Sequence, residues 1–436
     1  MIRRRLQRMS AEHVQVDLLI VGAGPAGLAA AISAREAGVQ GILVLEREDF
    51  QGGILRQCIH NGFGLHRFKT ELTGPEYAQR DIQRAQELML DIRCGVTVLN
   101  ITSDRLVTAI SREDGLVTYQ AKAVILAMGC RERPRGALAI PGTRCAGIYS
   151  AGTAQRFVNL EGLMPGNRVV ILGSGDIGLI MARRMTLQGA EVLACVELMP
   201  YSSGLNRNIV QCLDDYGIPL LLSHTVVNIH GRERLTGVTV AQVDEHRNPI
   251  PGTEKEFDCD TLLLSVGLIP ENELSLSAGV QLSLATSGAV VDNSLQTSVP
   301  GIFACGNVLH VHDLVDHVSH ESAVAGRAAA AYIQGKAWRG TPIPVMDGTG
   351  VRGCVPQSII LTEGSVDFSV DVMFRPTGVY RDHYVVIQTD DRVLLSRRSM
   401  ILTPGEMAVY TLTPAMLEQC RGASGITVRI SPEKPA

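Results

Sequence analysis

The 436-residue sequence predicts an α/β protein built from two related parallel-sheet domains and a small, mostly β domain at the C-terminus. A glycine motif that joins an apolar strand to a helix occurs twice, starting at Gly22 and at Gly173. After Pro342 the helical segments give way to short runs of β type. Because a motif that recurs within one chain indicates repeated supersecondary units, we expect two domains of one kind followed by one of another.

The first glycine motif has the residue order of a dinucleotide-binding unit. The apolar run Val16–Val21 enters it as a strand, and an Ala-rich helix reaching Ala37 leaves it. In such a unit the first glycine permits a tight turn, the second lets a pyrophosphate approach the backbone, and the third lets the helix pack closely on the strand. These glycines are Gly22, Gly24 and Gly27. The pyrophosphate would lie at the helix N-terminus, toward which unpaired N–H groups point.

An acidic residue completes this unit. Glu46 follows the next apolar strand, Ile42–Leu45, and lies 24 residues after Gly22 (46 − 22 = 24). At that position a carboxylate accepts hydrogen bonds from a ribose. With strand, helix, second strand and acid all in place, we favour a dinucleotide site over a glycine-rich turn in another kind of α/β protein.

Loop, helix and strand signals alternate after Glu46. The glycine-rich stretch 51–64 is too polar for a core, so we expect it to lie along the bound cofactor. The patterns then predict an amphipathic helix over 73–90, a strand over 96–101, a hairpin formed by 106–110 and 117–119, and a buried parallel strand over 123–128 that ends at Gly129.

The second glycine motif repeats the first with the same spacing. A strand over 168–172 leads into Gly173, Gly175 and Gly178. Glu197 follows the next strand, 24 residues after the first of these glycines (197 − 173 = 24). No arginine comes directly after Glu197, where an NADP site would place one, so the acid favours the free ribose of NAD(H). Two such units in one chain most economically bind two dinucleotides whose reactive rings meet, and a degenerate or purely structural second site is the alternative.

Strand signals return in the last part of the α/β region. A strand over 261–266 ends in Gly267, as the earlier one ends in Gly129, and such strand ends commonly return the chain between interleaved domains. Another strand reaches Gly306 and Asn307, and a helix to about Ile333 follows it. The β-type runs beyond Pro342 are 366–374, 384–388, 392–395, 407–412 and 426–430.

Composition excludes several classes of protein. A net charge of −4 gives no basic field, so nucleic acid is not an expected partner, and no apolar run is long enough to span a membrane. The ten cysteines are scattered without any Cys-x-x-Cys pair, which excludes closely spaced iron–sulfur and zinc motifs and favours a reducing compartment, the cytoplasm. The stretch 1–10 carries four arginines but no apolar signal core, and we interpret it as a disordered basic tail, with Met9 as an alternative start.

Taken together, the two glycine motifs with their acids and the segment Thr297–Asn307 resemble the two-dinucleotide-fold flavoproteins of the thioredoxin-reductase type. The resemblance implies two interleaved Rossmann-like domains, one for FAD and one for NAD, together with the small β domain. The FAD domain would comprise 1–143 and 266–338, the inserted NAD domain 144–265, and the C-terminal domain 339–436. In this family a Gly-Asp pair after the late strand returns to the FAD. Here Asn307 replaces the Asp, so its amide can bond a ribityl hydroxyl but carries no charge.

Further segments refine the resemblance. Ala151 and Ala154 stand where a thioredoxin reductase carries its redox cysteines, so disulfide reduction by that route is excluded. The local amino-acid sequences of three segments resemble those of FAD/NAD-linked subunits of heteromeric dehydrogenases. The segments are Gly53–Leu65, Leu72–Tyr77 and His312–Ser319. These subunits are the flavoproteins that accompany glycerol-3-phosphate-dehydrogenase-like subunits, and the alpha-type subunits of opine oxidase, hydrogen cyanide synthase, proline dehydrogenase and sarcosine oxidase. The resemblance implies a partner flavoprotein dehydrogenase subunit that acts on the small-molecule substrate.

The motifs and the resemblance together assign candidate cofactor residues. Those expected to bind FAD are Gly22, Gly24, Pro25, Ala26, Gly27, Glu46, Gly53, Val96, Gly129, Gly306 and Asn307. Those expected to bind NAD are Gly173, Gly175, Asp176, Ile177, Gly178, Glu197 and Gly267.

Two groups of residues have a less specific pattern. Cys58 and His60 are candidates for a group on the flavin side, although a buried inert thiol explains Cys58 better, since no lysine follows to lower its pKa. A set of histidines and acids invites a metal interpretation, but a polar face at a cofactor or subunit interface explains it, and we assign no metal. This set is His310, His312, Asp313, Asp316, His317 and His320.

The expected function is that of an FAD-dependent, NAD(H)-linked oxidoreductase subunit in which hydride passes directly between nicotinamide C4 and flavin N5. Without a dithiol, the other electron path leads to a partner dehydrogenase or a small acceptor. The alternatives are a self-sufficient NADH oxidase or peroxidase that uses Cys58, and a non-catalytic scaffold. We also expect that deleting 345–436 leaves FAD binding intact and abolishes assembly with the partner.

Overall fold

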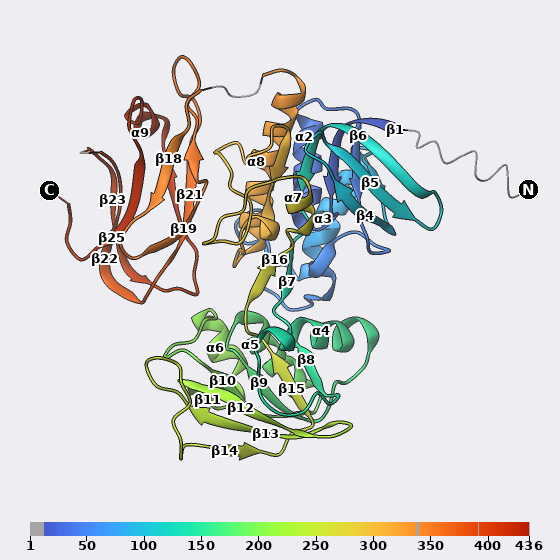
Figure 1. Cartoon of the computed structure of the whole chain (residues 1–436), viewed down its shortest axis with the longest axis vertical. Helices are drawn as coiled ribbons and strands as arrows, with labels where there is room; N and C mark the ends of the chain where they lie inside the picture. The colour runs from blue at the N-terminus through green and yellow to red at the C-terminus, as the bar shows by residue number, and fades with distance from the viewer. Residues whose placement is uncertain (1–12, 337–339, 391, 436) are drawn as a thin grey trace, which may run out of the picture. The chain divides into compact units, whose positions relative to one another are not determined.

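The computed structural model describes residues 13–336, 340–390 and 392–435, so the predicted basic tail lies outside the described residues. The chain divides into two compact units, shown in Figure 1. The first consists of Met1–Cys130, Pro270–Thr403 and Met407–Ala436, and the second of Arg131–Ile269 with Pro404–Glu406. The domain boundaries given above stay predictions.

The first unit is built on a seven-stranded sheet. In spatial order its strands are β3 (Asp91–Arg93), β2 (Ile42–Leu45), β1 (His13–Val21), β6 (Gly115–Leu126), β5 (Leu106–Ser111) and β4 (Val96–Ile101), and β17 (Ile302–Ala304) also pairs with β6. The β3-β2-β1-β6 path and the β6–β17 pair are parallel, whereas β4 and β5 form an antiparallel extension. Every residue of β2 is buried, as expected for a strand with both faces covered.

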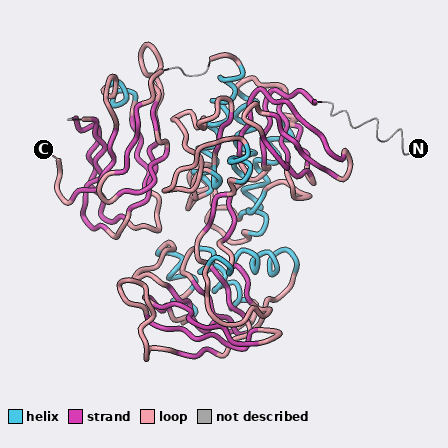
Figure 2. The backbone as a smooth tube through the Cα atoms, in the orientation of Figure 1, coloured by secondary structure: helices cyan, strands magenta, loops and turns pink. Residues whose placement is uncertain are grey.

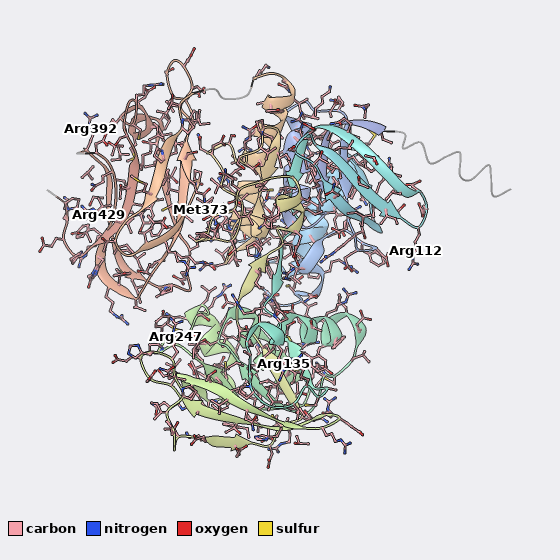
Figure 3. All side chains as sticks on the ribbon, viewed as in Figure 1. Arg112, Arg135, Arg247, Met373, Arg392 and Arg429 are labelled. Atoms are coloured by element: carbon pink, nitrogen blue, oxygen red, sulfur yellow. The ribbon has the colours of Figure 1, made fainter. Side chains whose placement is uncertain are left out.

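Strand β6 joins two segments that the sequence pattern separates. We predicted a hairpin strand over 117–119 and a separate strand over 123–128, which is wrong, because one strand of 12 residues runs through both. Its first half pairs with β5 and its second half with β17, along the edge that β1 leaves free. The exposed Lys122 interrupts the apolar run without interrupting the strand. Arg112 lies in the turn that joins β5 to β6 (Figure 3).

Helices α2 (Pro25–Glu36) and α8 (Val315–Ile333) pack against each other through small residues. A Cβ on Gly326 would overlap the carbonyl oxygen of Ala30, so only glycine fits there. Ser33 Oγ donates a hydrogen bond to the carbonyl of Ala323 at 2.9 Å. The Ala-rich sequence of α2 is therefore explained by close approach of two helix backbones.

The shorter helices of the α/β part are η1 (Gly53–Gln57), α3 (Gly74–Glu87), α7 (Glu273–Ser277) and η5 (Gly306–Val308). Helix α3 begins with a capping box, in which Thr73 and Glu76 each bond the other's backbone N–H. We expected the last helix to start directly after Asn307, but η5 is a single turn and α8 starts only at Val315. The intervening residues form a loop that is central to the site below.

The C-terminal part of the first unit contains a five-stranded and a three-stranded sheet (Figure 2). The first is ordered β20 (Ser358–Ile359), β18 (Ile343–Asp347), β25 (Ile426–Ser431), β22 (Tyr380–Thr389) and β23 (Arg392–Leu402), and the second β19 (Val351–Val355), β21 (Val370–Pro376) and β24 (Ala408–Leu412). Figure 2 also shows its short helix α9 (Pro414–Glu418). The sheets enclose an apolar core of their own. The five predicted β-type runs all overlap strands, and β18, β19 and β20 were not predicted.

This β-rich part is fastened to the α/β part of its unit. Val355 is fully buried within the α/β core, and the next glutamine, Gln357, accepts from and donates to the backbone of Val291. Arg375 Nη2 lies 2.5 Å from Asp313 Oδ1, and the N–H of Met407 donates to Asp313 Oδ2 at 2.6 Å. Deleting 345–436 would therefore expose residues of the α/β core and leave the Asp313 carboxylate without these two partners. These contacts do not support the expectation that the deletion leaves FAD binding intact.

Asp313→Ala should lower the thermal unfolding midpoint of the protein by several degrees. The variant loses two hydrogen bonds to a charged group, each worth about 1.5–3 kcal/mol, and leaves Arg375 without this carboxylate. Circular dichroism melts measure the effect. Asp91→Ala is the matched control, because its ion pair with Arg93 is about half exposed and such pairs contribute little. Equal shifts for the two variants would contradict the fastening role of Asp313.

The second unit contains a parallel five-stranded sheet and an antiparallel three-stranded sheet. The first is ordered β11 (Leu220–Leu222), β10 (Glu191–Glu197), β9 (Arg168–Leu172), β15 (Thr261–Leu264) and β8 (Ile148–Ser150), and the second β12 (His224–Gly231), β13 (Leu235–Gln242) and β14 (Lys255–Phe257). Side chains on β9 alternate between two cores: Val169 and Ile171 pack with the helices, Val170 and Leu172 with the smaller sheet. Its helices are α4 (Ala151–Arg156), η3 (Phe157–Glu161), α5 (Asp176–Leu187), α6 (Asn206–Cys212) and η4 (Asp214–Tyr216).

Short strands occur where the chain passes between the units: β7 (Cys130–Glu132) on the way out, β16 (Leu268–Pro270) on the way back, and η2 (Arg135–Ala137) after β7. Among the described residues, no helix has both the length and the apolar character needed to cross a membrane.

Candidate dinucleotide sites and the loop beside the first

The first glycine turn is as tight as its sequence predicts. Gly22 has φ +104°, and a Cβ there would lie 2.5 Å from the carbonyl oxygen of Ala127 at the end of β6. A Cβ on Gly27 would overlap the carbonyl oxygen of Gly22. Gly24 differs, because a Cβ there meets only Gly53 Cα, at 3.8 Å. No part of the described chain therefore requires glycine at this position, which is the one the motif reserves for a pyrophosphate.

Glu46 is buried beside this turn. Its Oε2 accepts the N–H of Ala23 at 2.7 Å, and its Oε1 accepts the N–H of Glu48 at 2.9 Å. A carboxylate has about four acceptor positions, so each oxygen can still accept a ribose hydroxyl. Helix α2 starts at Pro25 without a side-chain cap or an acid in its first turn, which leaves its first N–H groups for an anion.

The second turn repeats this geometry. Gly173 has φ +96°, and a Cβ there would overlap the carbonyl oxygen of Ser265 after β15. Glu197 Oε2 accepts the N–H of Ser174 at 2.9 Å, and its Oε1 accepts the N–H of Met199 at 2.9 Å. In both units the acid thus bonds the residue after the first glycine and the residue two positions after itself.

Two residues of the second site were missed at the sequence level. Ser174 also donates its hydroxyl to Glu197 at 2.5 Å, and Ser265 Oγ accepts the N–H of Gly178 at 3.0 Å. The predicted residue Asp176 starts α5, but its Oδ1 accepts from the N–H of Leu205 and from Asn208 Nδ2, so it positions the 202–208 segment. Ser174 stands between two motif glycines and Ser265 lies two residues before Gly267, and serine is too common in turns for either position to be a specific signal.

The glycine-rich stretch 51–64 lies against the first turn. The N–H of Gly52 donates to the carbonyl of Ala23 at 2.9 Å, and Gly53 faces Gly24. Cys58 packs against Gly74 at the start of α3, and its burial raises the pKa of the thiol to about 12. His60 bonds the carbonyl of Asn61 through Nδ1 and lies near the ring of Phe63. The raised pKa disfavours a thiolate at Cys58.

Other predicted residues lie around the two turns. Pro25 and Ala26 form the first turn of α2, and Val96 is buried at the start of β4, where its N–H donates to the carbonyl of Glu46. Ile177 is in the first turn of α5. Gly129 and Gly267 have positive φ, and a Cβ added at either would meet no described atom within 4 Å, so no clash explains glycine there. Whether these residues contact a cofactor stays a prediction.

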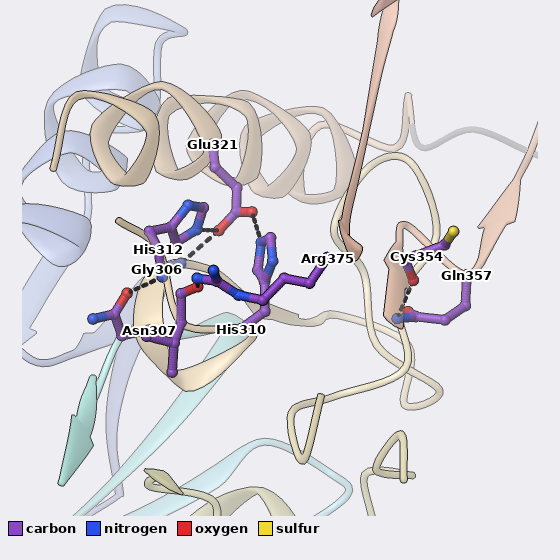
Figure 4. A network of polar contacts seen from close by, with 9 residues as sticks. Gly306, Asn307, His310, His312, Glu321, Cys354, Gln357 and Arg375 are labelled. Atoms are coloured by element: carbon purple, nitrogen blue, oxygen red, sulfur yellow. Dashed lines mark hydrogen bonds and ion pairs between the residues drawn. The ribbon is translucent and has the colours of Figure 1, made fainter. Parts of the chain in front are cut away.

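The loop from Gly306 to Leu314 is held by one buried acid of α8 (Figure 4). Glu321 Oε1 accepts the N–H of Gly306 at 2.7 Å, and its two oxygens accept from His310 Nε2 at 2.5 Å and His312 Nε2 at 3.2 Å. Asn307 Oδ1 accepts the N–H of His312 at 3.0 Å. Burial by itself raises the pKa of Glu321, but the two imidazoles and their hydrogen bonds hold it well below its usual range.

The other histidines and acids of the predicted polar set separate from this cluster. Asp316 accepts the N–H groups of Gly64 and Arg67, while His320 pairs with Asp371 of β21 at 3.3 Å. The predicted polar set does not form one face of a helix, because α8 starts only at Val315, after His312 and Asp313. The acid that organises the cluster, Glu321, was missed. Its signal was a charged residue flanked by the small buried residues of α8.

Both turns satisfy the requirements of a dinucleotide site. Each offers a glycine turn at a helix N-terminus and a buried carboxylate held by backbone N–H groups. Gly306 continues the first site, since a Cβ there would lie 2.7 Å from Ala26 Cβ at the start of α2. Ala151 and Ala154, at the positions predicted to lack redox cysteines, are fully buried in α4.

Comparison with known proteins finds a matching family and several related proteins. The model of the family described as pyridine nucleotide-disulphide oxidoreductase matches residues 16–335. An opine oxidase subunit of Agrobacterium tumefaciens is 28% identical, over 72% of this chain and 64% of its own length. Hydrogen cyanide synthase subunit HcnB of Pseudomonas protegens is 26% identical, over 68% of this chain and 66% of its own length. This chain thus spans slightly less than two thirds of each of these relatives.

The solved structures agree in fold. Thioredoxin reductase of T. acidophilum is 27% identical, with a TM-score of 0.60 over 74% of this chain and 99% of that one. L-proline dehydrogenase of P. horikoshii has a TM-score of 0.53 at 19% identity, over 74% of this chain and 56% of that one, which shows the fold alone.

Proposed function

The chain belongs to the pyridine nucleotide-disulphide oxidoreductase family, whose proteins bind FAD and NAD(P)H, and on this basis we propose that it is the electron-transferring subunit of a heteromeric dehydrogenase. It passes electrons between NAD(H) and a partner flavoprotein or a small acceptor without a redox disulfide. The single observation that carries the proposal is the repeated turn, in which one chain presents two buried glutamates with the same backbone partners.

The first turn holds FAD. Gly24 leaves room for the pyrophosphate, and the uncapped N–H groups at the start of α2 bind it. The buried Glu46 accepts hydrogen bonds from the hydroxyls of the adenosine ribose. Bound FAD supplies a two-electron acceptor for hydride. The residues of this chain bind and orient the two cofactors, and no side chain near the first turn is required as an acid or base for that step.

The second turn holds NAD(H). Glu197 is buried, carries a charge that opposes a 2′-phosphate, and is fixed by Ser174 and Met199 rather than free to turn away. Alanines at 151 and 154 support electron exit by a route other than a dithiol, and all ten cysteines are free thiols. Two relatives carry the word subunit in their names, which supports a partner for this chain as well.

The proposal is tested by isolating the native complex. A co-purifying flavoprotein dehydrogenase, added back to the purified chain, should restore electron transfer between its substrate and NAD(H). The chain alone should not reduce low-molecular-weight disulfides or thioredoxin. Rapid disulfide reduction by the chain alone would contradict electron exit without a dithiol, and full dehydrogenase activity without any second protein would contradict the subunit role.

The main alternative, an NADH oxidase or peroxidase that uses Cys58, makes a separate prediction. Because burial raises the pKa of Cys58 to about 12, the thiolate is scarce at neutral pH. Cys58→Ser should therefore leave the rates of NADH oxidation by O₂ and by H₂O₂ unchanged. Cys94→Ser, at a cysteine outside both turns, is the matched control. A selective loss of either activity in Cys58→Ser would support the alternative.

A further inference from the structure

The His310–Glu321–His312 cluster has one polar atom that no described residue satisfies. Glu321 accepts from Nε2 of both imidazoles, so each ring carries a proton on Nε2, and in a neutral His312 Nδ1 is then the acceptor. His312 Nδ1 is buried and has no hydrogen-bond partner among the described residues. An unpaired buried acceptor costs about 1–3 kcal/mol, so a group that persists in this state calls for an explanation.

A bound metal ion does not explain this arrangement. His310 Nε2 and Glu321 Oε2 are 2.5 Å apart, the separation of a strong hydrogen bond, whereas zinc holds each ligand atom about 2.0–2.2 Å from itself and its ligands farther from one another. Histidines that bind a metal almost always donate their second ring nitrogen to a partner. For His312 Nδ1 the described part of the chain supplies none. The geometry fits a hydrogen-bonded proton site better.

The cluster lies directly behind the segment assigned to FAD. Glu321 Oε1 accepts a hydrogen bond from the N–H of Gly306, and Asn307 Oδ1 accepts one from the N–H of His312. Gly306 in turn touches the start of α2, where the pyrophosphate binds in the proposed function. The charge of reduction develops on the flavin ring, which the ribityl chain joins to the pyrophosphate, and Asn307, the residue expected to bond that chain, accepts the N–H of His312. The charge would therefore act on His312 through a water-poor interior, in which Coulomb interactions are stronger than in water.

We infer that His312 Nδ1 takes up a proton when the bound flavin is reduced, and that His310 and Glu321 hold it in position to do so. The inference rests on the proposed function, because it requires FAD at the first turn. A hydride from the reduced nicotinamide brings two electrons and one proton, and leaves one extra negative charge on the reduced flavin. The second proton comes from solvent and forms the Nδ1–H bond of His312, which restores the local charge balance.

The surrounding groups are consistent with a neutral His312 before reduction. Desolvation lowers the pKa of His312, against the opposing attraction of Glu321, so the imidazole is neutral at neutral pH. Added negative charge nearby raises that pKa and favours protonation. The other titratable and charged groups around it are His310 and Asp313 on its own loop, His317 on α8, and Arg375 of β21, which is paired with Asp313.

The test is an electrode titration of the flavin in the full-length, FAD-bound protein at several pH values around neutrality. Each proton taken up with two electrons shifts the midpoint potential by about 30 mV per pH unit, since a tenfold change corresponds to 29.6 mV for a two-electron couple. The wild type should show about 60 mV per pH unit, for two protons. His312→Gln, which keeps a donor for Glu321 but cannot accept a proton, should show about 30 mV per pH unit.

Two matched variants and one control measurement complete the test. Glu321→Gln removes the carboxylate that attracts the proton and should also flatten the slope, whereas His320→Gln, at a mostly exposed histidine of the same helix, should keep it. An unchanged slope in His312→Gln would overturn the inference, as would a stoichiometric metal in wild-type protein. If the variants fail to fold, proton uptake by the wild type during electrode reduction decides. One proton per two electrons with an anionic reduced-flavin spectrum overturns the inference, because that proton is on the flavin, and two protons with the same spectrum support it.

The electrode also separates this inference from the proposed function. Electrode reduction does not need a nicotinamide or a partner protein. A two-proton slope that depends on His312 in a protein that NADH fails to reduce would leave the inference intact and reject the proposed electron donor.

Discussion

Gly24→Val should give a folded protein that purifies without flavin. The wild type should be yellow, with FAD bound noncovalently. Gly24 has an ordinary extended backbone with φ −75°, and a Cβ there meets only Gly53 Cα at 3.8 Å, so the backbone and the nearest described atoms accept a side-chain Cβ. The branched side chain would instead occupy the place of the pyrophosphate. A loss of about 3 kcal/mol or more corresponds to FAD binding more than a hundredfold weaker.

Flavin absorbance of the purified protein and circular dichroism together measure this result. Gly27→Ala is the matched control, because its Cβ would overlap the carbonyl oxygen of Gly22. That variant should lose both fold and flavin, whereas Gly24→Val should lose flavin alone. Retention of FAD in Gly24→Val, or a colourless wild type that no flavin restores, would reject the first turn as the FAD site.

The second large effect concerns the choice of nicotinamide. NADH should reduce the flavin at least about a hundredfold more efficiently than NADPH, because Glu197 would face the 2′-phosphate. Two like charges a few ångströms apart cost on the order of a few kcal/mol at an effective dielectric of about 20. Glu197 is buried and fixed by two backbone N–H groups, so it cannot turn away from the phosphate without losing those bonds.

Glu197→Ala should remove most of this preference, and stopped-flow reduction with each nucleotide measures it. Retained flavin shows that the first unit is still folded. Glu46→Ala is the symmetric control: it should weaken FAD binding and leave the ratio of NADH to NADPH efficiency unchanged in the protein that is reloaded with FAD. Equal rates for the two nucleotides in the wild type would contradict the NAD(H) assignment.

The elements that sequence predicted well are those in which local pattern and tertiary role coincide. At Gly22 and Gly173 the backbone needs positive φ and has no room for a side chain, so the motif is required by geometry. Thr73 and Glu76 likewise specify the start of α3 by their mutual hydrogen bonds. In these cases a few neighbouring residues determine the structure.

The remaining features depend on partners far along the chain. Strand β6 extends through Lys122 because β1, β5 and β17 pair with it, and none of these contacts is local. Glu321 is important because the loop after Gly306 folds back onto α8, which helical spacing alone does not reveal. The fastening of the β-rich part by Asp313 is equally non-local, and the sequence therefore indicated a free module where the structure shows a bound one.

Anaerobic mixing of the FAD-bound chain with NADH tests most directly whether the two turns work as a pair. We expect the visible absorbance of the flavin to bleach in a single fast phase, with one NADH oxidised per FAD, and Glu197→Ala to slow this phase with NADH. A flavin that stays oxidised with excess NADH, while an electrode reduces it readily, would show that the second turn does not deliver electrons and would contradict the proposed electron transfer.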